Sequence, residues 1–238
     1  SLMLAGWLGR FVLAGSYSMD VVGRFTYHYN VILMLTALSS PLIANPIGPY
    51  VIEAYNTGRP RRSGDLLGKA LRLRVMVIAP LLVVTIVCGN ELITVLARQE
   101  YTAAGGLLAL LTPIALLAIV SSTFEQVLFL ERRTAVIGRC YVAAGAMQLG
   151  LFILLVPFHP YYGAAAAMNL GMAALVGLLW FFARSAEVSV KLALGRIGAA
   201  AALCLSVAWL VKGMALHLQP LLLLGAVTAA TGVSFLAC

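Results

Sequence analysis

The feature that most constrains this chain is a series of long apolar runs, separated by short segments that carry most of its charge. Only 10% of the 238 residues are charged, against about 25% in a soluble globular protein. A helix needs roughly 20 apolar residues to cross the hydrocarbon core of a bilayer, which is about 30 Å thick. The runs are about that long, and they lack the polar–apolar alternation of a membrane β-barrel. We therefore predict an all-α integral membrane protein.

The apolar runs predict a polytopic bundle of about eight transmembrane helices. We expect them at about 1–16, 21–44 with a continuation to Tyr55, 65–88 followed by a short piece, 103–131, 134–156, 162–184, 190–212 and 219–238. The stretch NPIGP is expected to break the second helix, since proline removes a backbone donor. The first run lacks an initiator Met, a basic leader and a clear cleavage site, so we expect a chain that begins inside a helix, as a fragment would.

The segments between these runs alternate between basic and nearly neutral. Twelve of the 16 basic residues fall in every second connection, namely Arg59, Arg61, Arg62, Lys69, Arg72, Arg74, Arg132, Arg133, Arg139, Arg184, Lys191 and Arg196. Cytoplasmic loops of membrane proteins carry an excess of Lys and Arg, so this side and the C-terminus are predicted to be cytoplasmic. The same bias explains the net charge of +8, so we expect no nucleic-acid partner.

Signatures of enzyme chemistry are missing from the sequence. The four cysteines show no CxxC spacing, and no two of the three histidines are four residues apart. No Walker A, GxGxxG or GxSxG motif is present. We therefore expect no metal, no cofactor and no enzyme activity.

Four segments carry a resemblance to a known family. They are GRFVLAGSYSMDVVGRFTYHYN, with Arg10 and Gly23 thirteen residues apart, NELITVLARQEYTAAGGLLALLTP, FEQVLFLERRT and LLVPFHPYYGAAAAMN. In this order they cover most of residues 9–185 and resemble the polysaccharide biosynthesis branch of the multidrug/oligosaccharidyl-lipid/polysaccharide exporters. Two positions depart from the family pattern: Gly9 stands where the family has Asp, and Asn30 stands where relatives often have Arg or Lys.

The resemblance implies the C-terminal part of a two-lobe flippase. Residues 1–185 would form the second six-helix lobe, with its first helix truncated, and 186–238 would add two transmembrane helices. The implied function is to flip an undecaprenyl-pyrophosphate-linked oligosaccharide across the bacterial inner membrane by alternating access, for cell-surface polysaccharide export. The implied partners are this lipid-linked substrate, membrane lipids and the amino-terminal lobe of the same protein.

Four residues near the N-terminus are candidates for the substrate cavity. Ionisable residues inside membrane helices are costly and usually face a cavity, which makes Arg10, mid-way along the first run, the strongest candidate. Snorkelling to the interface is the alternative for Arg10 and an equal one for Arg24. Tyr27 and Asn30 are placed to face sugar, although an aromatic belt explains the tyrosine equally well.

Glu125 is an acidic residue in an otherwise apolar run. It precedes Arg132 by seven residues, which places it about 10 Å along the helix from the cytoplasmic boundary. We predict an ion pair with Arg139 on the next helix, which lies at comparable depth. The alternative is a carboxylate that couples transport to a proton or another cation.

Two further expectations concern helix packing. Gln148 and Asn169 are single polar residues on apolar helices, and we expect them to form interhelical hydrogen bonds. Ala167 and Gly171 have the small-xxx-small spacing that lets two helix backbones approach closely.

Two other functions remain open from the sequence. A multidrug or toxin exporter coupled to cations would use acidic cavity residues. Glu125 fits this function, whereas Arg10 fits the flippase, so the sequence leaves both open. A membrane polysaccharide polymerase or ligase would need a large periplasmic loop, and the segments PFHPYYG and RQEYTAAGG are short.

Overall fold

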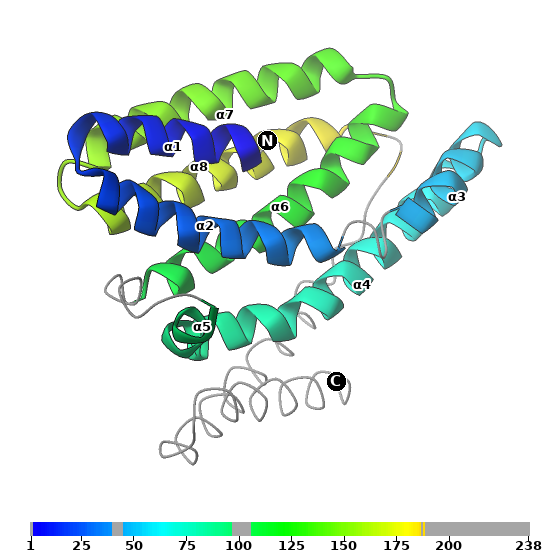
Figure 1. Cartoon of the computed structure of the whole chain (residues 1–238). Helices are drawn as coiled ribbons and strands as arrows, with labels where there is room; N and C mark the ends of the chain where they lie inside the picture. Colours follow the sequence, from blue (N-terminus) through cyan, green and yellow to red (C-terminus); the bar gives the residue numbers. More distant parts are fainter. Residues whose placement is uncertain (1, 40–44, 97–105, 187, 189–238) are drawn as a thin grey trace.

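The computed structural model describes residues 2–39, 45–96, 106–186 and 188, and over these ranges it contains helices and no strand (Figure 1). The elements are α1 (Leu2–Ser16), α2 (Met19–Ser39), α3 (Asn45–Asn56), α4 (Pro60–Val87), α5 (Gly89–Leu96), α6 (Leu107–Leu130), α7 (Thr134–Leu155) and α8 (Pro160–Ala183). The all-α prediction is confirmed for this part of the chain. The helices predicted at 190–212 and 219–238, and so nearly all of the predicted unit 186–238, lie outside the described residues.

Four helices of the described ranges are long and apolar enough to cross a membrane, namely α4, α6, α7 and α8. The remaining helices do not reach that combination of length and apolarity. The first has 15 residues, the third 12 and the fifth 8, while α2 has 21 residues but carries several polar side chains. The chain therefore has the character of a membrane protein, and the count of eight spans is not confirmed.

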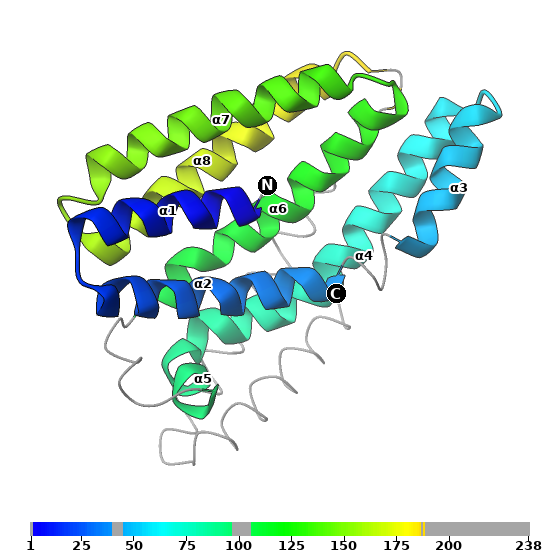
Figure 2. The same ribbon diagram turned by 45° about the horizontal axis from the view of Figure 1, so that its top comes forward.

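Helix α6 crosses the middle of the bundle and packs against α2, α4 and α8 (Figures 1 and 2). Its apolar side chains Leu111, Ile114 and Ile119 are fully buried. Antiparallel hairpins surround it: α1 with α2, α3 with α4, and α7 with α8. The core thus lies around α6, and the hairpins place the candidate site residues at its edges.

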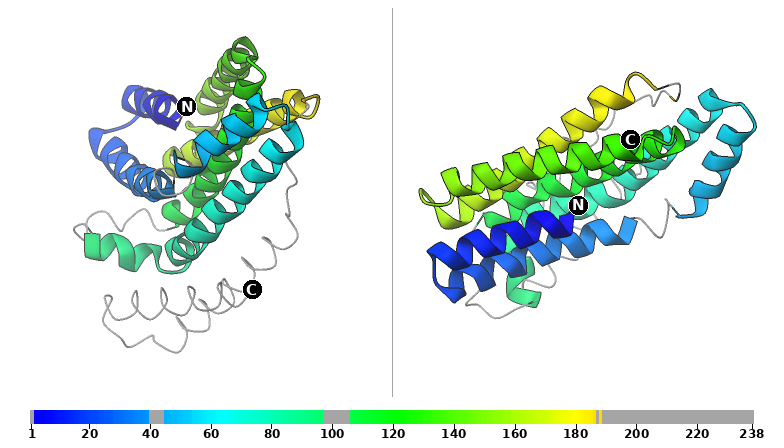
Figure 3. Two further views of the ribbon diagram at one scale, coloured as in Figure 1. Left: turned by 90° about the vertical axis from the view of Figure 1, so that its right-hand side faces the viewer. Right: turned by 90° about the horizontal axis from the view of Figure 1, so that it is seen from above.

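The turns between the helices lie at two ends of the bundle (Figure 3). The α3–α4 turn, the α6–α7 turn and the end of α8 lie at one end, while the α1–α2 and α7–α8 turns lie at the other. We call the first the basic end, because it carries the exposed arginines Arg59, Arg61, Arg62, Arg132, Arg133 and Arg184. The basic connections that the sequence placed on one side therefore do lie at one end of the structure.

Both helix-to-helix turns at the basic end have the same left-handed geometry. In the first, Gly58 has φ 72°, and the amide of Arg59 donates to the carbonyl of Ala54 at 3.0 Å. In the second, Arg132 has φ 57°, and the amide of Arg133 donates to the carbonyl of Leu128 at 2.9 Å. These are Schellman motifs, in which glycine normally occupies the left-handed position. Arg132 therefore holds a conformation that costs roughly 1–2 kcal/mol for a residue with a Cβ.

Two helix starts differ from the sequence prediction. Helix α4 begins at Pro60 instead of near residue 65, because proline is well suited to a first helical turn and its missing N–H costs nothing there. Helix α3 begins at Asn45, so NPIGP forms its first turns and is not the break itself. The end of α2 at Ser39 agrees with an interruption of the predicted second helix.

The α7–α8 hairpin depends on one glycine. A Cβ at Gly163 would overlap the carbonyl oxygen of Leu155 and lie 2.7 Å from its carbonyl carbon. The clash is with backbone atoms, which cannot swing aside as a flexible side chain can. Gly163 belongs to the PFHPYYG segment, and the first turn of α8 can approach the end of α7 only because this position has no side chain.

We predict that Gly163→Ala destabilises the protein by about 1–3 kcal/mol, because overpacking at a rigid contact forces the backbone to move. The matched control is Gly177→Ala on the same helix, where a Cβ meets nothing within 4 Å. The thermal unfolding midpoint of the purified protein in detergent measures the difference. Equal midpoints for the two variants would contradict the close approach.

We also predict that Arg132→Gly stabilises the protein by about 1 kcal/mol, because glycine adopts positive φ without steric cost. The opposite change at the equivalent turn, Gly58→Ala, is expected to lower the unfolding midpoint. A lower midpoint for Arg132→Gly would show that its left-handed backbone carries no strain.

Candidate functional site

Helix α2 has one buried side and one outward side. Phe25, Tyr29 and Ile32 are at most 1% exposed and face the core. At 100° per residue, the opposite side carries four polar residues within an arc of about 120°. We call these the α2 polar stripe: Asp20, Arg24, Tyr27 and Asn30, each exposed or half-buried.

Arg10 reaches this stripe from α1. Its guanidinium Nη2 donates to Oδ1 of Asn30 at 3.0 Å, near the middle of α2. The buried ring of Tyr29 lies close enough for the charge of Arg10 to act on it. Two candidates separated by 20 positions are thus brought together. The guanidinium of Arg10 therefore bonds near the middle of α2 and away from both ends of that helix.

Arg24 is held within its own helix. It forms an ion pair with Asp20 one turn earlier, with Nη2 and Oδ2 2.9 Å apart. The Asp20 side chain is 64% exposed and that of Arg24 25%, so the pair faces outward near the first turn of α2. Arg24 is thus partly neutralised, while Tyr27 lies half-buried on the same side of the helix.

Gly9 lies at a close contact between α1 and α7. Gly9 is buried, and a Cβ there would lie 2.9 Å from the ring of Phe152 on α7. The Phe152 side chain is fully buried. An aspartate at position 9 would displace this ring, so the local sequence is adapted to α1–α7 packing.

The predicted ion pair between Glu125 and Arg139 is wrong. The carboxylate of Glu125 instead accepts a hydrogen bond from the hydroxyl of Tyr141. Tyr141 and Arg139 both lie on α7. Arg139 is exposed. Two residues on a helix are about 200° apart, so Tyr141 and Arg139 point in nearly opposite directions. The rotation of α7 thus places Tyr141 opposite Glu125.

Arg74 is a second buried ionisable residue that the sequence did not single out. Its side chain is 5% exposed, and its Nη1 donates to the hydroxyl of Ser122 at 2.7 Å. The opposite charge of Glu125 also acts on it. Together, Arg74, Ser122, Glu125 and Tyr141 form the α4–α6–α7 polar cluster, which links three helices.

The sequence counted Arg74 with the basic residues of a connection between helices, whereas the structure buries it within α4. The spacing between Arg72 and Arg74 could have indicated in advance that one of them is buried. Two residues on a helix point to nearly opposite sides, so Arg72 and Arg74 cannot both face the same solvent. Arg72 is exposed and Arg74 is buried.

The packing expectations are confirmed in part. Asn169 Nδ2 donates to the carbonyl of Leu110 on α6 at 2.7 Å, an interhelical bond as predicted. A Cβ at Gly171 would lie 2.7 Å from Cβ of Gln148, so α7 and α8 approach closely there. Gln148 itself is 5% exposed, and its Nε2 makes no hydrogen bond within the described residues. The predicted interhelical hydrogen bond is therefore not found for this amide nitrogen among the described residues.

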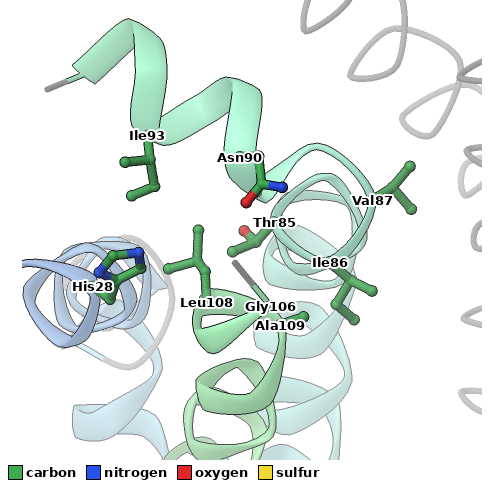
Figure 4. Close-up of a pocket in the computed structure, with 10 residues that line it drawn as sticks. His28, Thr85, Ile86, Val87, Asn90, Ile93, Gly106, Leu108 and Ala109 are labelled. Carbon is green, nitrogen blue, oxygen red and sulfur yellow. The ribbon is translucent and has the colours of Figure 1, made fainter. Parts of the chain in front are cut away.

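A small cavity of about 160 Å³ lies where α2 approaches the α4–α5 junction and the start of α6 (Figure 4). Its polar walls include His28, Thr85 and Asn90. His28 is 2% exposed, and its Nδ1 donates to the carbonyl of Arg24 at 2.7 Å. This volume has room for a handful of water molecules, at about 30 Å³ each, and is too small for an oligosaccharide.

No group of three or more His, Cys, Asp or Glu side chains suited to a metal ion occurs in the part of the chain that the structure describes. Comparison with known protein families and with curated proteins finds no match to this chain. Two polar arrangements are therefore the candidate functional sites: the α2 polar stripe with Arg10, and the α4–α6–α7 polar cluster.

We predict that Tyr141→Phe lowers the free energy of unfolding by about 1.5–3 kcal/mol, because it removes a hydrogen bond to a charged acceptor. Arg139→Ala is the matched control on the same helix and is expected to stay within about 0.5 kcal/mol of the parent protein. Unfolding in mixed detergent micelles, followed by tryptophan fluorescence, measures both variants.

A larger loss for Arg139→Ala than for Tyr141→Phe would contradict the observed partner of Glu125 and favour the ion pair read from the sequence. Glu125→Gln gives a second check. It keeps an acceptor for Tyr141 but removes the charge that acts on Arg74, and it is expected to destabilise the protein as well.

Proposed function

We propose that this chain forms one lobe of a carrier that flips a lipid-linked oligosaccharide with an anionic pyrophosphate across a membrane. The observation that carries the proposal is the α2 polar stripe, joined by Arg10, on the outward side of an apolar helical bundle. A charged side chain at the bilayer centre costs about 2.5–3.5 kcal/mol on insertion scales. Such a stripe is therefore better explained by an aqueous cavity than by contact with lipid.

The chemistry of the stripe suits a phosphorylated sugar. A guanidinium presents donors in a planar fork that matches phosphate oxygens, and Asn30 orients Arg10 near mid-depth. Asn30 and Tyr27 also offer amide and hydroxyl groups for sugar hydroxyls. Because Asp20 already balances Arg24, Arg10 is the principal cation for the pyrophosphate.

The surrounding architecture suits a two-lobe carrier. In this proposal a second lobe, supplied by the remainder of the protein, covers the outward side of α2, and the two lobes open alternately to each face of the membrane. The α4–α6–α7 polar cluster holds three helices together, which favours movement of the lobe as one body. The membrane is the bacterial inner membrane, with the basic end and the C-terminus in the cytoplasm.

One observation favours a second candidate, the cation-coupled exporter. Glu125 is a carboxylate inside the bundle, as such a carrier requires. However, Tyr141 donates to it, and Arg74 supplies an opposite charge nearby. These partners give Glu125 a structural role in holding the helices together. A flippase for a lipid-linked oligosaccharide therefore remains our first choice. No observation favours a polysaccharide polymerase or ligase.

We predict that Arg10→Ala lowers the flipping rate about tenfold or more, because a charge-assisted hydrogen bond to phosphate contributes about 1.5–3 kcal/mol. Arg10→Lys is expected to retain part of the rate. The assay reconstitutes the full-length protein in proteoliposomes and follows a fluorescent undecaprenyl-pyrophosphate oligosaccharide by the fraction that an external quencher reaches.

Arg61→Ala is the control, since this arginine is exposed at the basic end and far along the chain from the stripe. The proposal is wrong if the parent protein moves no lipid-linked sugar. It is also wrong if Arg10→Ala and Arg61→Ala have equal effects.

A further inference from the structure

The α3–α4 hairpin contains a cavity that the proposed transport function does not use. The hairpin extends from the bundle at its basic end (Figures 1 and 3). Near its tip lies a cavity of about 250 Å³, lined by Tyr50, Glu53, Ala54, Thr57, Arg59, Arg62 and Leu66. This volume is large enough to hold a phosphate group together with part of the molecule that carries it.

Local hydrogen bonds hold the walls of this cavity in place. The hydroxyl of Ser63 on α4 donates to the carbonyl of Val51 on α3 at 3.1 Å, and Ser63 is fully buried. The hydroxyl of Thr57 donates to the carbonyl of Glu53 at 3.0 Å. With the left-handed turn at Gly58, these bonds set the position of the arginines before any ligand arrives.

The arginines of this cavity differ from Arg133 at the same end. Among the described residues, neither Arg59 nor Arg62 forms an ion pair with a carboxylate, and both are exposed. Arg133, by contrast, pairs with Glu131 at 3.1 Å. Glu53 also lines the cavity, so its walls carry two positive charges and one negative charge.

The length of α4 allows the tip of the hairpin to reach the lipid headgroups. Helix α4 has 28 residues and is therefore about 42 Å long, which exceeds the hydrocarbon core of about 30 Å. Its first turns contain Arg61, Arg62 and Asp65, and these are the turns expected to extend beyond the hydrocarbon. On α3, Tyr50 is 64% exposed and Ile52 is 48% exposed.

We propose that this cavity binds the phosphate of an anionic phospholipid headgroup, with Arg59 and Arg62 as the cationic ligands. The exposed side chains of Tyr50 and Ile52 argue for a lipid over a free phosphate. Aromatic and apolar side chains at headgroup level favour contact with the membrane, whereas a soluble anion makes no use of them. The site anchors the hairpin to the anionic leaflet at the basic end.

Native mass spectrometry of the purified full-length protein tests the proposal, with phosphatidylglycerol and phosphatidylcholine present at equal concentration. We expect preferential binding of phosphatidylglycerol. Loss of a charge-assisted hydrogen bond to phosphate weakens binding about tenfold or more, so Arg59→Gln with Arg62→Gln should weaken binding about 100-fold or more. The matched control, Arg61→Gln with Arg132→Gln, removes the same charge at the same end outside the cavity and should change binding less than the cavity pair does.

Three results would overturn the proposal. The first is equal binding of the two lipids by the parent protein. The second is an equal loss in the cavity variant and the control variant, which would show a diffuse charge effect. The third is displacement of the lipid by glycerol phosphate at concentrations as low as those of the lipid, which would assign the cavity to a soluble phosphate. Unchanged unfolding midpoints in phosphatidylcholine confirm that both variants are folded.

Discussion

Polar groups inside this bundle depend on partners within the protein, because a hydrocarbon environment supplies none. The structure meets this need in two ways. Buried threonines turn their hydroxyls back to a carbonyl one turn earlier, as Thr36 does to Ile32 at 2.8 Å and Thr112 to Leu108 at 2.9 Å. Longer side chains reach across helices, and the α4–α6–α7 polar cluster and the Asn169 bond to α6 are the result. The packing around α6 therefore combines apolar contact with a few directional bonds.

The polar groups that face outward are subject to the same constraint, because they too need partners that hydrocarbon does not supply. The α2 polar stripe is turned away from the core, yet it lies on a helix whose other side is deeply buried. Arg10 reaches it from a neighbouring helix, so α1 and α2 present a single polar surface. The proposed carrier function follows from this division, because an aqueous cavity between two lobes is the environment in which such a surface is stable.

The ends of the bundle have a different role from its middle. Tight left-handed turns gather exposed arginines at one end, and some of these are already engaged by neighbouring groups, as Arg133 is by Glu131. Arg59 and Arg62 instead line a cavity whose walls are held by backbone and side-chain hydrogen bonds. In the proposed scheme, the α2 polar stripe and Arg10 in the middle of the bundle bind the substrate. The α3–α4 hairpin binds the lipid surface.

The sequence by itself determined the helical class, most helix positions to within a few residues, and the separation of basic from neutral turns, because these depend on local apolarity and chain direction. It also identified Arg10, Asn30 and Glu125 as unusual, since polar groups stand out in apolar runs. Only the tertiary structure decided their partners. Depth along a helix follows from residue count, whereas the neighbour of a side chain depends on how each helix is rotated. That rotation placed Tyr141 beside Glu125, left Arg139 exposed and buried Arg74.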